Sequence, residues 1–206
     1  MILRPFRGAA FTLAAAGDQR SDHAERESVA AELGIDTEWA TLHQVHGRTV
    51  LEAKHPGELG DGDALFTRVT GLPLAVFTAD CAAVVLEGDG IVGIAHAGWR
   101  GLAAGVIGAL RTAMDEAGSA AKVAAIGPAI GSCCFEVGEE VAEQFPHEQG
   151  TTTWGSPSVD LLASARAQLA GLDVWDAGRC TGHDPGLFSH RRQRTGNRMA
   201  AIGWLG

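Results

Sequence analysis

The sequence predicts an α/β (α+β) fold, a single-domain αβα sandwich in which helices cover the faces of a mixed β-sheet. Short apolar runs alternate with helical patterns along the chain, and several apolar runs follow one another directly. That second feature favours a mixed sheet over a purely parallel one. A length of 206 residues suits one domain, 1–206, and no internal repeat or linker divides it.

Apolar runs and turn residues predict the first elements. Arg4 and Arg7 before the apolar segment 9–16 suggest a secretory leader, but the segment is too short and too polar for one. We therefore expect a strand there. A helix is expected over 22–34, with Asp22 as its N-cap and Gly34 as its stop. The next elements are strand, turn and strand in 39–50, a loop over 54–62, and buried strands in 72–86 and 91–95 with a tight turn at 88–90.

The same patterns continue to the C-terminus. Amphipathic spacing predicts helices, and short apolar runs between glycines predict buried strands. In order, the expected elements are a helix over 98–114, a strand over 122–126, a loop over 127–131, a short helix within 136–145, a helix over 159–169, a strand over 174–177 and a closing strand over 200–205.

Composition and charge exclude several classes of protein. A net charge of −9 argues against a broad grip on nucleic acid, and only 6% aromatic residues with no tyrosine leave little for base stacking. No apolar run is long enough to span a membrane. Four cysteines are too few for a disulfide scaffold, so we expect reduced thiols and a cytoplasmic protein.

Three segments place a histidine or cysteine at the end of an apolar run, beside a turn or helix start, where α/β sheets build sites. These segments are 42–47, 78–81 and 95–101. Two histidines and one cysteine, His46, Cys81 and His96, would leave a fourth metal position open, as in catalytic zinc sites. The residues alone leave two alternatives: a metal-free Cys–His dyad, and packing residues without chemistry.

Polar residues near these segments are candidates for substrate contact. Arg100 and the pair Arg191–Arg192 could bind phosphate, although arginines are often solvated or paired with acids. His43 is a candidate polar site residue. Asp80 adjoins Cys81 and would point to the opposite face if its strand continued.

Five motifs together resemble the YfiH-type laccase-domain family, and they occur in family order from about residue 39 to the C-terminus. They are HQVHG at 43–47, ADC at 79–81, HAGWRG at 96–101, IGPAIGSCCFEVG at 126–138, and CT at 180–181 followed by FSHRR at 188–192. Members of this family have been called polyphenol oxidase, peptidoglycan editing factor and purine nucleoside phosphorylase.

The resemblance implies zinc bound by His46, Cys81 and His96. It implies phosphorolysis of adenosine, inosine, guanosine and methylthioadenosine, together with adenosine deamination, so that a purine nucleoside and phosphate are the expected partners. His43, Arg100 and Arg191 are the candidate substrate-binding residues. The chain departs from the family pattern between Gly17 and Asp22, where a pocket-framing segment is shortened.

Three other functions remain as alternatives. A Cys–His hydrolase that edits peptidoglycan precursors would use Cys81 as thiolate and would survive chelation. Copper-dependent phenol oxidation is less favoured than zinc chemistry, because the three methionines lie outside the ligand motifs and a multicopper enzyme needs more histidine ligands. A non-catalytic ligand-binding protein would tolerate His46→Ala without functional loss.

Overall fold

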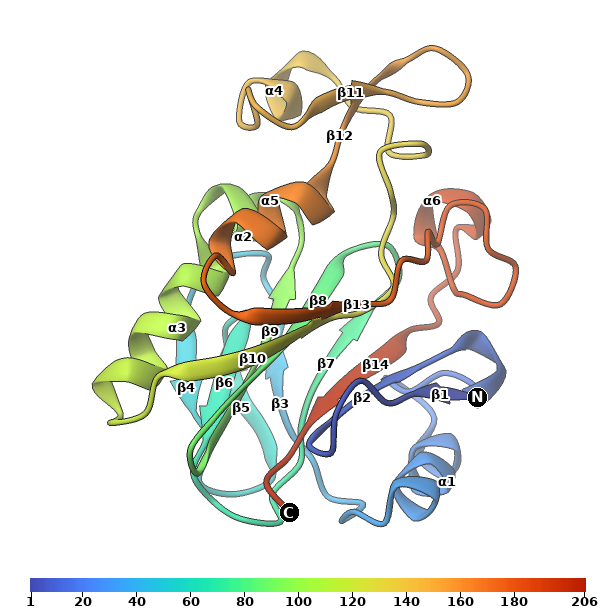
Figure 1. Cartoon of the computed structure of the whole chain (residues 1–206). Coiled ribbons are helices and arrows are strands. Elements are labelled where there is room, and N and C mark those ends of the chain that lie inside the picture. Colours follow the sequence, from blue (N-terminus) through green and yellow to red (C-terminus); the bar gives the residue numbers. More distant parts are fainter.

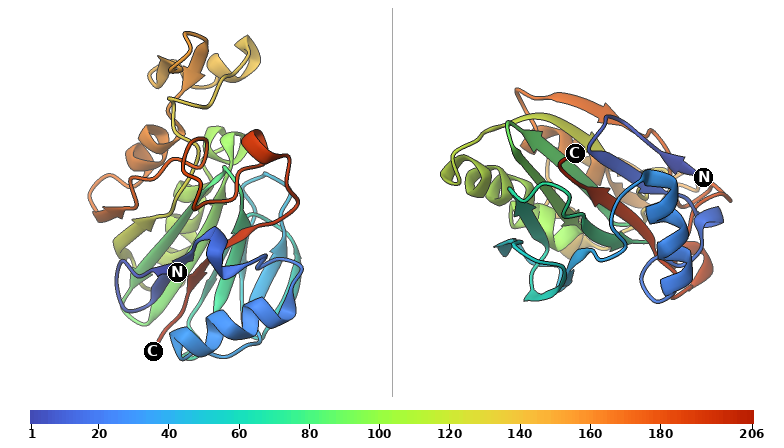
Figure 2. Two further views of the ribbon diagram at one scale, coloured as in Figure 1. Left: turned by 90° about the vertical axis from the view of Figure 1, so that its right-hand side faces the viewer. Right: turned by 90° about the horizontal axis from the view of Figure 1, so that it is seen from below.

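Two six-stranded mixed sheets pack face to face in the computed structural model, which describes residues 1–206. Helix α1 covers the outer face of one sheet, and α2, α3 and α5 cover the outer face of the other (Figures 1 and 2). The mixed α/β class is confirmed. Twelve of the fourteen strands form two sheets, whereas one sheet was expected from the sequence.

The first sheet has the strand order β1-β2-β14-β7-β3-β5. Its strands are β1 (Ile2–Leu3), β2 (Ala9–Thr12), β14 (Met199–Gly203), β7 (Leu74–Thr78), β3 (Ala40–His43) and β5 (Gly57–Asp61). The second sheet has the order β13-β10-β8-β9-β6-β4. Its strands are β13 (Asp173–Asp176), β10 (Ala121–Ile126), β8 (Ala82–Gly88), β9 (Ile91–Ala97), β6 (Ala64–Thr67) and β4 (Val50–Glu52).

The helices are few and mostly short. They are α1 (His23–Leu33), α2 (Trp99–Ala103), α3 (Val106–Glu116), α4 (Glu139–Ala142), α5 (Leu161–Gln168) and α6 (His190–Gln193), with a 3-10 turn at Ala14–Ala16. The Asp22 carboxylate caps α1, and Gly34 ends it in the left-handed conformation, as predicted. None of the helices has the length and apolar character needed to cross a membrane.

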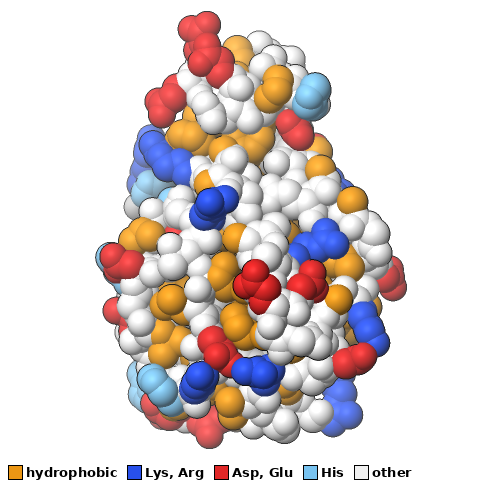
Figure 3. All heavy atoms as spheres, turned by 90° about the vertical axis from the view of Figure 1, so that its left-hand side faces the viewer, with side chains coloured by type: hydrophobic (Ala, Val, Ile, Leu, Met, Phe, Trp, Pro, Cys, Tyr) orange, Lys and Arg blue, Asp and Glu red, His pale blue; other side chains and the backbone are white.

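The face that carries α3 is mixed in character. Acidic and basic side chains are interspersed on it, and hydrophobic side chains gather below a small projecting lobe (Figure 3). This lobe contains α4 and a hairpin of β11 (Gln149–Thr151) with β12 (Pro157–Val159), and it stands away from both sheets (Figure 1).

Several expectations from the sequence were wrong in detail. The loop expected over 54–62 contains β5, a strand at the edge of the first sheet that pairs with β3. The helix expected within 136–145 is limited to the four residues of α4, and Glu136, at its expected start, instead forms a β-bridge with Ser158 of β12. Neither that hairpin nor α6 was predicted, since both are short and mostly exposed.

The two-sheet arrangement follows from strands that are buried on both faces. Every residue of β7 and β9 is buried, and the layer between the sheets includes Leu74, Val76, Val92 and Ile94. Such strands are continuous apolar runs without a two-residue period, so the sequence marks them as buried but does not assign them to a sheet.

The helix expected over 98–114 is instead two helices, α2 and α3, separated at Gly105. This residue has φ +80°, which is left-handed, and a Cβ placed there would meet no heavy atom within 4 Å. The chain turns there because glycine adopts this conformation without a Cβ clash.

Gly105→Ala is therefore expected to destabilise the fold by about 1–2 kcal/mol, the cost of a left-handed alanine. Gly108→Ala is the matched control, because Gly108 lies inside α3 with equally open space and an ordinary φ. That variant should gain roughly 0.5–1 kcal/mol from helix propensity. Urea unfolding of both variants measures the difference, and equal effects would contradict the role given to Gly105.

Candidate metal and active site

The structure brings His46, Cys81 and His96 together at one end of the two sheets. His46 follows β3, Cys81 lies in the connection from β7 to β8, and His96 lies near the end of β9. The three ligand atoms lie within 4.8 Å of one another. The two imidazole rings meet nearly edge to face, with centroids 4.8 Å apart and an interplanar angle of 80°.

Asp63 is a fully buried carboxylate that orients both histidines. Its Oδ1 lies 2.7 Å from Nδ1 of His96, which leaves Nε2 of that ring for a metal. The backbone amides of His46 and Gly47 donate to Asp63 at 2.9 and 2.6 Å, and the amide of Val45 donates at 3.3 Å. A carboxylate behind a ligating histidine is a common device for fixing the ring in metal sites.

The same bonds hold His46 in an uncommon backbone conformation. Its φ of +61° is left-handed, which costs a non-glycine residue about 1–2 kcal/mol. The grip of Asp63 on the amides of residues 45–47 compensates for that cost. A strained residue at a site fits the tendency of functional side chains to be held in such conformations.

Asp80 connects the site to the C-terminal part of the chain. Strand β7 ends at Thr78, and Asp80 has φ +94°, so the strand does not continue through Asp80. Its carboxylate accepts hydrogen bonds from the Thr181 hydroxyl and the Arg191 amide. Its backbone carbonyl accepts from the amide of Ile130 at 2.8 Å. Asp80 thus holds three segments around Cys81.

A second clamp joins the His46 loop to the strand before Cys81. The Gln44 side chain donates to the carbonyl of Phe77 at 3.0 Å and accepts from its amide at 2.9 Å. The glutamine therefore pairs with β7 as another strand would, and it sets the spacing between His46 and Cys81.

Burial and hydrogen bonds shift the pKa values of two of the three side chains in opposite directions. Burial opposes ionisation of Cys81, but hydrogen bonds with His46 and His96 outweigh it and lower the thiol pKa to about 6. Burial alone would lower the pKa of His96, because it disfavours the charged ring. Hydrogen bonds with Asp63 and Cys81 outweigh this effect and raise the pKa to about 9. By contrast, burial and its thiol neighbours raise the pKa of Cys134 to about 12.

The donor set fits a transition metal such as zinc. One thiolate and two imidazoles supply three ligands, and the absence of a fourth protein ligand is the arrangement of catalytic zinc sites. Gly98 is part of the same fit, since a Cβ there would stand 3.0 Å from Sγ of Cys81 and 3.0 Å from Cδ2 of His46. His46, Cys81 and His96 are therefore the residues that could hold the ion.

A cavity of about 350 Å³ opens beside these three residues. That volume is at the lower end of the roughly 300–1,000 Å³ of small-molecule sites. The lining combines three arginines with apolar and aromatic side chains. Its residues are Arg20, Gln44, His46, Phe77, Thr78, Ala79, Asp80, Cys81, His96, Ile130, Phe135, His190, Arg191 and Arg198.

One of the three predicted substrate-binding residues lines the cavity, and the other two do not. Arg191 lines the cavity, with its guanidinium 5.2 Å from the Phe135 ring centroid. His43 instead pairs with Asp61 at 2.7 Å on the surface, and Arg100 lies over the Trp99 ring; neither lines the cavity.

Sequence reasoning missed several residues of the site. Arg20 and Arg198 both line the cavity, and the amide of Arg198 donates to Asp18, so the shortened N-terminal segment still reaches the site. Asp63 had one usable signal, an acidic residue immediately before the buried run of β6. Phe77 and Phe135 carried no signal beyond ordinary core character.

Comparisons with known proteins show what the chain is similar to. The family described as multi-copper polyphenol oxidoreductase laccase matches residues 3–206. The chain is 41% identical over 198 residues to purine nucleoside phosphorylase ORF3 of Streptomyces griseus, covering 88% of this chain and 80% of the relative. It is 39% identical to a purine nucleoside phosphorylase of Deinococcus radiodurans, covering 90% and 80%. The crystal structure of Bacillus licheniformis hypothetical protein YfiH superposes with a TM-score of 0.86 at 26% identity, covering 96% and 92%.

Proposed function

The chain belongs to the laccase-like YfiH family, described as multi-copper polyphenol oxidoreductase laccase, and we propose that it is a zinc-dependent purine nucleoside phosphorylase. The convergence of His46, Cys81 and His96 on one cavity carries the proposal. The names of the Streptomyces and Deinococcus relatives support the reaction class. Adenosine, inosine, guanosine and methylthioadenosine are the substrates we expect.

Phosphorolysis breaks the bond between the base nitrogen and C1′ of the ribose and forms a bond from C1′ to a phosphate oxygen. The base leaves with a proton, and the sugar leaves as its 1-phosphate. When bound, a zinc ion supplies Lewis-acid polarisation to the atom at its open position. The chain must therefore bind an anion and a flat ring in one cavity, and hold them in line.

The cavity offers groups suited to both tasks. Arg20, Arg191 and Arg198 are available for phosphate, which arginine binds through several N–H groups at once. Phe77 and Phe135 offer aromatic faces for a purine ring. Asp80 positions the segment that carries Arg191, since it accepts a hydrogen bond from that residue's amide at 2.6 Å.

Arg191 is held by its surroundings as well as exposed to the cavity. Its Nη1 donates to the carbonyl of Glu136 at 2.8 Å, which reduces the freedom of the guanidinium. Arg191→Ala is expected to raise KM for phosphate about 10–100-fold, the equivalent of one charged hydrogen bond. Arg68→Ala is the matched control, because Arg68 is exposed and pairs with Glu52 away from the cavity. Steady-state kinetics at varied phosphate would contradict the assignment if both variants matched the wild type.

The primary test measures release of free base from adenosine and inosine, with and without phosphate. We expect release to require phosphate, to stop after chelation, and to return on addition of Zn²⁺. Hydrolysis of peptidoglycan precursors that is insensitive to chelation but blocked by thiol alkylation, with no release of base, would favour the Cys–His hydrolase. Recovery with copper alone, together with oxidation of phenols, would favour a polyphenol oxidase.

Adenosine deamination is a second candidate activity, favoured by the open fourth position on a site that faces the cavity. In this reaction water adds at C6 of adenosine, and ammonia leaves to give inosine. Ammonia release in the absence of phosphate is the expected sign.

If neither activity is seen, the chain is better described as a binding protein. A cytoplasmic location and the lack of a nucleic-acid partner stay predictions.

A further inference from the structure

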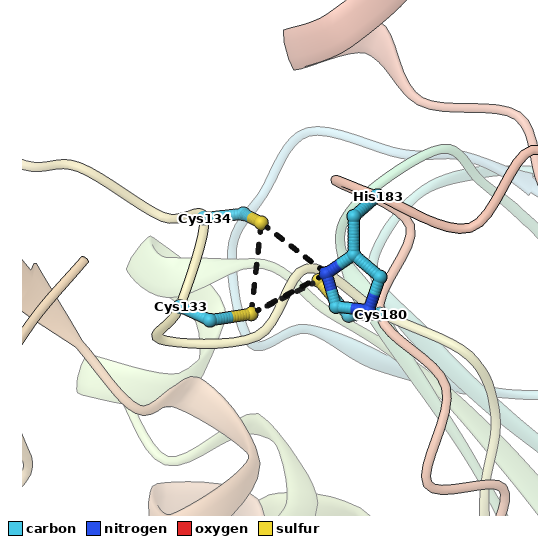
Figure 4. A group of neighbouring side chains, drawn as sticks. All are labelled: Cys133, Cys134, Cys180 and His183. Carbon is cyan, nitrogen blue, oxygen red and sulfur yellow. Dashed lines mark hydrogen bonds between the residues drawn. The ribbon is translucent and has the colours of Figure 1, made fainter. Parts of the chain in front are cut away.

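Four side chains of types that can bind a metal lie together where two loops meet, outside the site described above. Cys133 and Cys134 lie in the turn after β10, and Cys180 and His183 lie in the turn after β13. Their ligand atoms all lie within 4.8 Å of one another. Figure 4 shows the thiols and the imidazole directed toward one common point.

Four of the six distances among these donors are close to those of a tetrahedral metal site. The Sγ of Cys133 lies 3.6 Å from the Sγ of both Cys134 and Cys180, and the Nδ1 of His183 lies 3.7 and 3.5 Å from the Sγ of Cys133 and Cys134. Zinc bond lengths of about 2.3 Å to sulfur and about 2.0 Å to nitrogen give tetrahedral edges of about 3.8 and about 3.5 Å. The two sulfur–sulfur and two sulfur–nitrogen distances are close to these edges, and the other two pairs lie within 4.8 Å.

The backbone around the cluster is also fitted to it. The amide of Gly131 donates to Sγ of Cys180 at 3.1 Å, a contact that stabilises charge on a sulfur. A Cβ on Gly182 would stand 2.3 Å from Cβ of Cys134 and 2.8 Å from its sulfur, so only glycine lets the two loops approach this closely.

We propose that Cys133, Cys134, Cys180 and His183 form a second metal site, which binds Zn²⁺ as a structural ion. Three thiolates and one imidazole complete a tetrahedron and leave no open position, which is typical of structural zinc. The ion would join the loop after β10 to the loop after β13. Thr181, beside Cys180, donates to Asp80, so the same ion would also steady the wall of the cavity.

The test titrates Co²⁺ into full-length Cys81→Ser protein under reducing conditions, because this variant lacks a ligand of the first site. We expect one Co²⁺ per chain, with tetrahedral d–d bands and a charge-transfer band of three-thiolate intensity, and displacement by Zn²⁺. Adding Cys180→Ser should remove the signal. Adding His183→Ala to the Cys81→Ser protein should weaken Co²⁺ binding more than about 100-fold. Loss of a residue that only supports a metal ligand costs roughly 10–100-fold, so a larger effect marks His183 as a ligand. His55→Ala, another exposed histidine, is the matched control.

Three outcomes would overturn the proposal: no thiolate signal in Cys81→Ser, a signal unchanged by Cys180→Ser, or a disulfide within the cluster under the same reducing conditions. If Cys180→Ser is unfolded by circular dichroism, His183→Ala decides, because that side chain is exposed. The inference does not depend on the proposed nucleoside chemistry, whose failure would appear separately as absent turnover by the wild type.

Discussion

Cys81→Ala is expected to remove both the bound metal of the first site and nucleoside turnover while the fold remains intact. Cys81 supplies the only thiolate of that site, and its low pKa shows a sulfur already favoured as the anion. Two histidines alone form a much weaker site. Loss of the several kcal/mol that a Lewis acid contributes to the transition state corresponds to a fall in kcat/KM of more than about 1,000-fold.

The measurement pairs metal content per chain with kcat/KM for inosine. Metal content should fall by one ion relative to the wild type, and the circular dichroism spectrum and Tm should show a folded chain. His55→Ala serves as the control, since its imidazole is exposed and hydrogen-bonds to the carbonyl of the neighbouring Pro56. Turnover that persists after this metal is lost would refute the role of zinc.

Asp63→Ala is expected to cause the largest loss of stability in the site. The carboxylate is completely buried, and it accepts from the amides of residues 45–47 and contacts His96. Its removal leaves three amides and a buried imidazole without their partner. Breaking a buried charged pair in this way costs about 3–5 kcal/mol. The left-handed conformation of His46 would lose its support as well.

Asp63→Asn separates the effect of charge from that of shape. The amide keeps the volume and one acceptor oxygen, so we expect a smaller loss of stability but metal affinity lowered about 10–100-fold, as for other partners of ligating histidines. Asp61→Asn is the matched control, because Asp61 also contacts a histidine, His43, but on the surface. Urea unfolding and competition with a zinc chelator measure the two quantities. Equal metal affinity in Asp63→Asn and Asp61→Asn would contradict the role assigned to Asp63.

Features that depend on neighbouring residues could be predicted from the sequence. The capped helix α1 is one example, because Asp22 and Gly34 act on the turns next to them. The three candidate ligands are another, because each ends an apolar run beside a turn, and the structure brings them together. The spacing of these residues did not decide between a metal site and a Cys–His dyad. Resemblance to a family then favoured the metal site.

Features that depend on distant segments were decided by the tertiary structure. Asp63 stands out in the sequence only as an acidic residue before a buried run, and its role is not visible there, because its partners lie in other segments, in the turn after β3 and at the end of β9. The sequence also could not assign β7 and β8 to different sheets. Strands buried on both faces are continuous apolar runs, so they show no alternation of apolar and polar residues. Cys133 and Cys180 become neighbours only because β10 and β13 run parallel and end together. Local backbone preference acts over a few residues, whereas a buried carboxylate or a metal cluster is completed by side chains that only folding brings within bonding distance.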